Sequence, residues 1–86
     1  MSRFLAEVYV PRTRADESSR AARCARAAAK QLTREGTSVR YVRATLLPGD
    51  ETCFHVFEAP SADAVGEVGR RAGLSWARIV PAVEEE

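Results

Sequence analysis

The sequence predicts a single α+β domain in which strands and helices follow one another in the order β-α-β-β-α-β. Two observations carry this prediction. Four runs of the chain are rich in β-branched and aromatic residues, and two segments between them have the composition and the termini of helices. The chain has 86 residues, which is enough for one hydrophobic core and too few for two. We expect the domain to span residues 1–86, with residues 84–86 as a solvated acidic tail.

The first strand is predicted over residues 3–10, where the sequence RFLAEVYV ends at Pro11. The first helix follows in the alanine-rich segment SRAARCARAAAKQLTR, with Thr13 or Asp16 as N-cap and Gly36 after its last turn. At 100° per residue, one side of this helix is small and apolar and the opposite side is basic. The side expected to be buried consists of Ala21, Cys24, Ala25, Ala28 and Leu32.

The second and third strands are predicted to form a hairpin. Residues 38–47 are partly alternating and long enough for one strand, and residues 51–60, with the sequence ETCFHVFEAP, form the next. Pro48 and Gly49 between them are typical of a type II turn.

The second helix is predicted to begin after Ser61, an expected N-cap, and to end at Gly73 and Leu74 as in a Schellman motif. The glycines of GEVG lie inside this helix and are expected to allow another element to approach closely. The sequence WARIVPAV predicts a fourth strand, and Pro81 places that strand at a sheet edge or a bulge.

This order of elements is that of the ferredoxin-like fold. Right-handed crossovers put both helices on one face of a four-stranded antiparallel sheet, with the first and third strands in the middle. Both of those strands have apolar residues at both alternating sets of positions, so the sheet face without helices is also expected to be apolar. A small chain with such a face is expected to pair with a second copy, which gives a homodimeric assembly like a dimeric α+β barrel.

Composition limits the classes of partner. The formal net charge is +1, whereas nucleic-acid-binding modules usually have a much larger basic excess. No apolar run approaches the roughly 20 residues of a membrane span, and the first ten residues do not have the pattern of a signal peptide. We therefore expect a cytoplasmic protein whose partners are a second copy of itself and a small molecule or metal ion, with no nucleic acid and no membrane.

Three segments of the chain resemble a family of small bacterial ferredoxin-like domains of unknown function that includes nickel-binding proteins. These segments are RFLAE near the start, CFHVFEAPSADAV in the middle, and RRAGL with ARIV near the end. The resemblance implies the fold, a dimer and the binding of a divalent metal such as nickel. It also implies that acidic residues recur at the positions of Glu7 and Glu58. The chain departs from the metal-binding members in having one histidine, and none in its first strand.

Glu7 and Glu58 are the leading candidate site residues. They lie on the two central strands, which we expect to be parallel neighbours, and both would then face the dimer cavity as oxygen ligands or as an acid–base pair. Two carboxylates close together in an apolar cavity would raise the pKa of each other. In the alternative interpretation, each glutamate pairs with an arginine such as Arg43 or lies in water at the rim.

His55 is a third candidate, as a metal ligand or a general base. Strict alternation puts it on the face opposite to Glu58, where it would instead be a hydrogen-bonded core residue, unless a bulge reverses the strand. The hydroxyl groups of Tyr9 and Tyr41, together with Arg43, complete the predicted ligand-binding set.

The two cysteines are expected to be buried free thiols, because the spacing of Cys24 and Cys53 matches no zinc pattern.

Three functions remain open from the sequence. The first is a homodimeric binding protein that holds a divalent metal, nickel in particular, or a small ligand between two sheets. The alternative is a cofactor-independent isomerase, cyclase or monooxygenase of the dimeric α+β-barrel kind, with Glu7, Glu58 or His55 as its base. The third is a structural or regulatory partner protein. The sequence contains no recognisable nucleophile with a base and an orienting group, which favours binding over catalysis.

Overall fold

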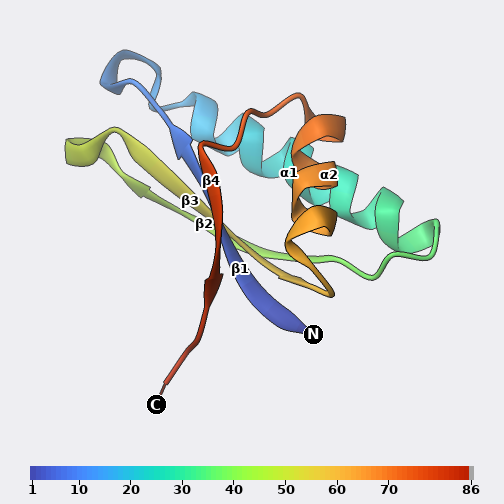
Figure 1. Ribbon diagram of the computed structural model, residues 1–86. Helices are drawn as coiled ribbons and strands as arrows, with labels where there is room; N and C mark the ends of the chain where they lie inside the picture. Colours follow the sequence, from blue (N-terminus) through green and yellow to red (C-terminus); the bar gives the residue numbers. More distant parts are fainter. Residues whose placement is uncertain (86) are drawn as a thin grey trace.

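The computed structural model describes residues 1–85, and within them it has four strands and two α-helices in the predicted order (Figure 1). None of the helices in this range is both long and apolar enough to cross a membrane. Residue 86, the last of the predicted tail, lies outside the described range. The elements are β1 (Ser2–Tyr9), α1 (Glu17–Arg34), β2 (Arg40–Leu47), β3 (Thr52–Ala59), α2 (Ala62–Ala72) and β4 (Arg78–Ala82), with short 3₁₀ turns η1 (Arg12–Arg14) and η2 (Pro48–Asp50).

The strands form one sheet in the order β2-β3-β1-β4, and each neighbouring pair is antiparallel. Both helices lie on the same side of this sheet (Figure 1). This is the ferredoxin-like α+β fold, and it confirms the predicted fold class and the central positions of β1 and β3. The expectation that β1 and β3 are parallel is wrong. A helix connects β1 to β2, so these two strands run in the same direction, and the hairpin then turns β3 back against both.

Alternate residues of the two central strands face the helices and form the core with them. Leu32 of α1 and Val65 and Val68 of α2 supply the larger apolar groups from the helix side, and α1 otherwise contributes alanines. Because alanine adds little thickness, α1 packs close to the sheet. The buried strand residues on this side are Phe4 and Ala6 of β1, Tyr41 of β2, and Cys53, His55, Phe57 and Ala59 of β3, and Val56 of β3 is buried on the opposite face.

The buried side of α1 is rotated slightly from the predicted one. Cys24 is exposed rather than buried, Ala21 is half-buried, and Ala29 is buried. Asp16 stands at the predicted N-cap position, but its side chain forms no capping hydrogen bond. After the last turn, Gly36 has a φ of 110°, a conformation that favours glycine.

The connection between β2 and β3 differs from the predicted type II turn. The 3₁₀ turn η2 lengthens the loop, and the left-handed conformation belongs to Glu51 (φ 51°) rather than to Gly49. The carboxylate of Glu51 accepts a hydrogen bond from the backbone N–H of Arg12 at 2.9 Å, and its backbone carbonyl accepts one from the N–H of Val10 at 2.8 Å. These contacts to a distant part of the chain stabilise a backbone conformation that the local sequence does not indicate.

Both predicted ends of α2 are confirmed. The hydroxyl of Ser61 accepts a hydrogen bond from the backbone N–H of Ala64 at 3.2 Å. At the other end, Gly73 is left-handed (φ 72°), and the N–H of Leu74 donates to the carbonyl of Gly69 at 2.8 Å. This Schellman ending directs the chain from α2 toward β4.

The two edge strands of the sheet are both irregular. Pro81 lies in β4, which is an edge strand as predicted. On the other edge, the pairing of β2 with β3 shifts register between Tyr41 and Arg43. Each irregularity interrupts the row of backbone groups that an edge strand presents.

Candidate functional site

The single histidine of the chain lies in the core, on the helix side of the sheet. His55 is fully buried, and its Nδ1 is 2.8 Å from the hydroxyl oxygen of Tyr41. The centroid of its ring is 5.3 Å from that of Trp76. Among the residues that the structure describes, its other ring nitrogen, Nε2, has no hydrogen-bond partner. Since a buried polar atom without a partner is costly, Nε2 is a candidate contact for a ligand.

Burial sets the protonation states of the histidine and its partner. Desolvation lowers the pKa of His55 to about 4, so its imidazole is neutral at neutral pH. Desolvation also raises the pKa of Tyr41 to about 12, so the phenol keeps its proton. The hydroxyl of Tyr41, which was predicted to be available to a ligand, is directed at His55 in the core.

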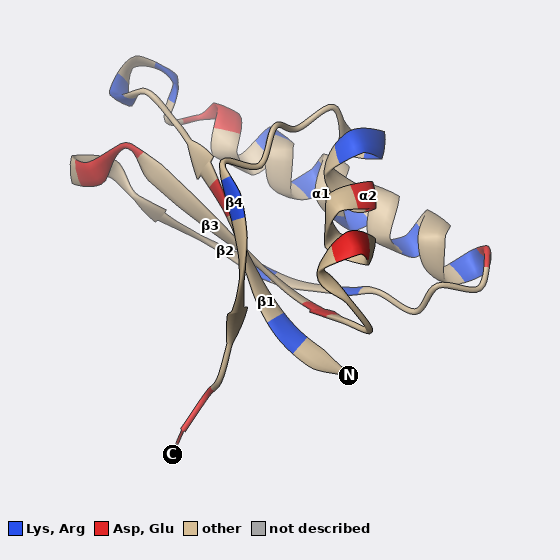
Figure 2. Ribbon diagram, viewed as in Figure 1, with Lys and Arg blue, Asp and Glu red and all other residues tan. Residues whose placement is uncertain are grey.

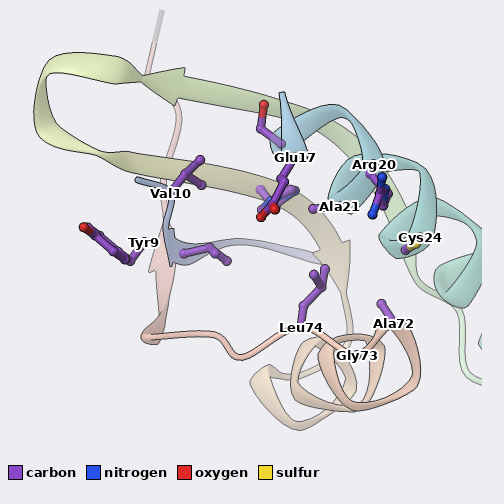
Figure 3. Close-up of a pocket in the computed structure, with 12 residues that line it drawn as sticks. Tyr9, Val10, Glu17, Arg20, Ala21, Cys24, Ala72, Gly73 and Leu74 are labelled. Carbon is purple, nitrogen blue, oxygen red and sulfur yellow. The ribbon is translucent and has the colours of Figure 1, made fainter. Parts of the chain in front are cut away.

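A cavity of about 290 Å³ lies between the first turns of α1 and the end of α2, with His55 in its wall (Figure 3). In Figure 3, side chains of α1 lie on one side of the cavity and Leu74 lies on the other, while the ring of Tyr9 points away from it. The thiol of Cys24 belongs to an exposed residue in this wall. The apolar lining comes from Val8, Val10, Ala21, Ala72 and Leu74.

The predicted carboxylates lie on the sheet face that has no helices, which we call the open face. Its centre is apolar, and charged residues of both signs surround that centre; Figure 2 shows acidic and basic residues on the same strands. The strand register assigns to the open face Arg3, Leu5, Glu7 and Tyr9 of β1, Thr52, Phe54, Val56 and Glu58 of β3, Arg40, Arg43, Thr45 and Leu47 of β2, and Arg78, Val80 and Ala82 of β4.

Glu58 is held by two arginines on the open face. Its Oε2 accepts a hydrogen bond from Arg3 at 2.8 Å, and its Oε1 accepts one from Arg40 at 2.7 Å. These hydrogen bonds, with that from Arg3 the stronger influence, lower the pKa of Glu58. The pKa of Glu58 is therefore not raised, and this glutamate is paired with arginines as in the alternative interpretation, with Arg3 and Arg40 in the place of Arg43. Arg43 lies instead 3.9 Å from Glu84 of the tail.

Glu7 has its own arginine partner and is not a neighbour of Glu58. Its Oε2 accepts a hydrogen bond from Nε of Arg78 at 2.7 Å. In the antiparallel register Glu7 lies opposite Phe54, four positions along β3 from Glu58. At about 3.3 Å per residue, that offset separates the two glutamates by about 13 Å along the strand. Within one chain they do not form a pair.

The side chains of one chain do not fit a nickel site. A divalent transition metal needs several nitrogen, sulfur or oxygen ligands around one point. In residues 1–85, no group of three or more histidine, cysteine, aspartate or glutamate side chains could hold a metal ion. His55 faces the helices, whereas Glu7 and Glu58 are on the open face and are already paired with arginines.

Residues 4–82 match a family model described as "Nickel responsive protein SCO4226-like". The chain belongs to the SCO4226-like family. This result confirms the resemblance to a small bacterial ferredoxin-like family associated with nickel. No curated protein matches the chain.

The fold is also similar to that of a solved structure. The crystal structure of SCO4226 from Streptomyces coelicolor A3(2) matches with a TM-score of 0.81 and 23% sequence identity. The match covers 99% of this chain and 100% of that chain. At this level of identity, the likeness shows the fold.

Sequence reasoning missed the cavity beside His55. The lining of this cavity comes from β1, α1, β3 and the end of α2, which no local sequence pattern links. The alanine-rich part of α1 gives no signal for it, because Ala21 is the one alanine of that helix in the lining.

Proposed function

We propose that this member of the SCO4226-like family is a binding protein that acts as a homodimer, with the open faces of two copies packed together and a ligand held between them. The ligand is a divalent metal, as the family's description suggests, or a small molecule. The observation that carries the proposal is the composition of the open face. Its centre consists of Leu5, Phe54 and Val80, which are half-buried, and of Val56, which is buried, and these residues lie on three adjacent strands.

The size of the chain and the charges around this centre support a second copy as the partner. A domain of this size buries only about 60% of its unfolded surface, so covering the open face adds appreciable stability. Both signs of charge surround the apolar centre, which lets two copies related by a twofold axis place arginines opposite carboxylates. The side chains of Arg40 and Arg78 pair with Glu58 and Glu7 within one chain, but they are 65% and 67% exposed, so a carboxylate of the partner copy can also reach them.

The protonation states favour binding over catalysis. A general base that works near neutral pH needs a pKa close to that pH. The pKa of Glu58 is instead lowered by Arg3 and Arg40, and that of His55 is lowered to about 4 by burial. We therefore prefer a binding protein to an enzyme of the dimeric α+β-barrel kind.

A metal in this arrangement would take its ligands from both subunits. One chain offers Glu7 and Glu58 on the open face at well-separated positions, so a complete set would need carboxylates of the partner copy. The metal would also have to replace the arginine partners of these carboxylates. A small molecule that contacts the apolar centre requires no such exchange.

Light scattering at micromolar concentration tests the dimer. We expect a mass of about twice 9.4 kDa for the unmodified chain. Phe54→Arg puts a charge in the apolar centre and should give a monomer that keeps its far-UV circular dichroism. Ala27→Arg, the matched control, places the same side chain on the exposed side of α1 and should remain dimeric. A monomeric unmodified chain would reject the proposal.

Calorimetric titration with nickel, and then with zinc and cobalt, decides between the two kinds of ligand. If a metal is the ligand, it should bind in a fixed ratio to the dimer, and Glu58→Gln should remove that binding. Glu85→Gln, an exposed tail position, is the control and should bind as the unmodified chain does. If none of the three ions binds, the ligand of the interface is not a divalent metal of this group. Binding that Glu58→Gln leaves unchanged would remove Glu58 from the site.

A further inference from the structure

The cavity beside His55 lies on the opposite side of the sheet from the open face. Its walls are side chains of β1 and α1 together with the segment that follows α2, and Figure 3 shows Ala21 and Cys24 of α1 across from Ala72 and Leu74. A volume of about 290 Å³ corresponds to roughly ten water molecules or a small organic molecule of similar size. The cavity is therefore large enough for a single-ring compound.

The hydrogen bonds around His55 indicate whether Nε2, its ring nitrogen without a partner, is a donor or an acceptor. The imidazole is neutral, so one ring nitrogen carries a proton and the other does not. If the hydroxyl of Tyr41 donates to Nδ1, the proton of the ring is on Nε2, and Nε2–H is the single group left without a partner. If Nδ1 donates to Tyr41 instead, both the Tyr41 proton and Nε2 lack partners. The first arrangement leaves fewer unsatisfied groups, so Nε2–H is a donor in need of an acceptor.

The remaining walls define the polarity of the molecule that fits. The apolar side chains of Val8, Val10 and Leu74 require a mostly apolar body. Two charged residues of opposite sign, Glu17 and Arg20, lie on α1 in the same lining and leave no net charge there. A neutral ligand therefore meets this lining at a lower desolvation cost than an anion or a cation does.

We propose that this cavity is a binding site for a neutral, single-ring-sized organic molecule whose oxygen accepts a hydrogen bond from Nε2–H of His55. Because solvent does not reach Nε2 in the ligand-free chain, the ligand has to displace neighbouring side chains of the lining to make this contact. The apolar body of the ligand would lie against β1 and Leu74, and His55 would give the site its preference for a molecule with an acceptor. The site uses the helix side of one chain, so it does not depend on the proposed dimer.

Two probe molecules of the same shape test this proposal. Acetophenone has a carbonyl oxygen, and α-methylstyrene has a CH₂ group in its place. In ¹H–¹⁵N NMR titrations at equal concentrations, acetophenone should shift the amides of Val8, Ala21 and Leu74 in a saturable way and should also shift Nε2 of His55. We expect α-methylstyrene to bind about tenfold more weakly, because it leaves the buried donor unpaired. Benzoate, the anionic counterpart, should bind more weakly than acetophenone.

A substitution in the wall of the cavity gives a second test that leaves His55 unchanged. Ala21→Leu fills the cavity from α1 and should abolish the binding of acetophenone. Ala27→Leu makes the same change on the exposed side of the same helix, outside this cavity, and should bind as the unmodified chain does. Melting curves of both variants establish that they are folded.

Cys24 supplies an independent readout. It is exposed and lines the cavity, whereas Cys53 is fully buried, so N-ethylmaleimide should modify Cys24 first and bound acetophenone should slow that reaction. Three results would each overturn the proposal: no saturable shift with either neutral probe, equal affinity for acetophenone and α-methylstyrene, or unchanged binding in Ala21→Leu. Tighter binding of benzoate than of acetophenone would overturn the assignment of a neutral ligand.

Discussion

Gly69 and Trp76 are in such close contact that a β-carbon on Gly69 would lie 2.3 Å from Nε1 of the indole ring. That nitrogen donates a hydrogen bond to the backbone carbonyl of Val65 at 2.9 Å, one turn earlier in α2. The same ring lies beside those of His55 and Phe57. The absence of a side chain at position 69 is therefore what lets Trp76 cover the aromatic part of the core, and it confirms the predicted close approach at the GEVG segment.

Gly69→Ala is expected to destabilise the protein by about 1–3 kcal/mol, because the cost of displacing Trp76 and its hydrogen bond exceeds the gain in helix propensity. Gly66→Ala is the matched control in the same helix. A β-carbon there would meet its nearest side-chain atom at 3.6 Å, an ordinary contact. Gly66→Ala should raise the stability by up to about 1 kcal/mol. Urea unfolding curves of both variants measure the difference, and equal stabilities would show that Trp76 moves aside at little cost.

The burial of His55 makes stability depend on pH. Its pKa is about 4 when folded and 6.5 when exposed, so the unfolded chain binds more protons between these values. Stability is complete above pH 6.5 and falls as the pH falls toward 4. The loss between pH 7 and pH 5 should be about 2 kcal/mol. Urea unfolding at pH 7, 6 and 5 measures it.

His55→Gln has no titratable group at this position and should lose most of that pH dependence. Glu58 affects stability in a different pH range. Its pKa is lower in the folded chain than its ordinary value of 4.5, so the stability that it contributes is lost only as the pH falls below about 4.5. A pH dependence between 7 and 5 that persists in His55→Gln would mean that another group causes it.

Glu58→Gln should lower the melting temperature at low salt, because it leaves Arg3 and Arg40 without their shared carboxylate. In 1 M sodium chloride the difference from the unmodified chain should shrink, since the Debye length at that ionic strength is about 3 Å. Glu85→Gln, at the exposed end of the chain, serves as the control and should have no effect in either condition. A difference that does not change with salt would indicate a packing role for Glu58.

Ser61→Ala should destabilise the protein by about 1 kcal/mol, because it removes the acceptor for the N–H of Ala64 at the start of α2. For a domain of this size that corresponds to a fall in melting temperature of about 4–8 °C. Ser19→Ala makes the same change at an exposed position of α1 and should be nearly neutral. Thermal unfolding followed by circular dichroism compares the two variants.

The elements and their order could be predicted because their signals are local. Ser61, Gly73 and Pro81 each indicate a structure through their own backbone chemistry, and the structure has each of them in the predicted role. The left-handed conformation of Glu51 could not be predicted in this way, since it depends on contacts with Arg12 and Val10.

The candidate site was harder to predict than the fold, because it depends on register and on side-chain direction. Alternation along β3 put His55 and Glu58 on opposite faces but left open which face carries His55, and the structure places it on the helix side. The relation of Glu7 to Glu58 required the direction of β1 relative to β3, and an error there turned two separated glutamates into an expected pair. Which arginines hold Glu58 depends on the same register, since Arg3 and Arg40 lie directly opposite it on the two neighbouring strands.

The irregular edges of the sheet have a consequence for how the protein can aggregate. Fibrils grow when strands of successive molecules add to an unpaired edge. One edge of this sheet contains Pro81, which has no backbone N–H to donate, and the other contains the bulge between Tyr41 and Arg43. Growth by strand addition is therefore disfavoured at both ends of the sheet. The proposed association through the open face would use that face in a single step, so an assembly formed in this way would stop at two copies.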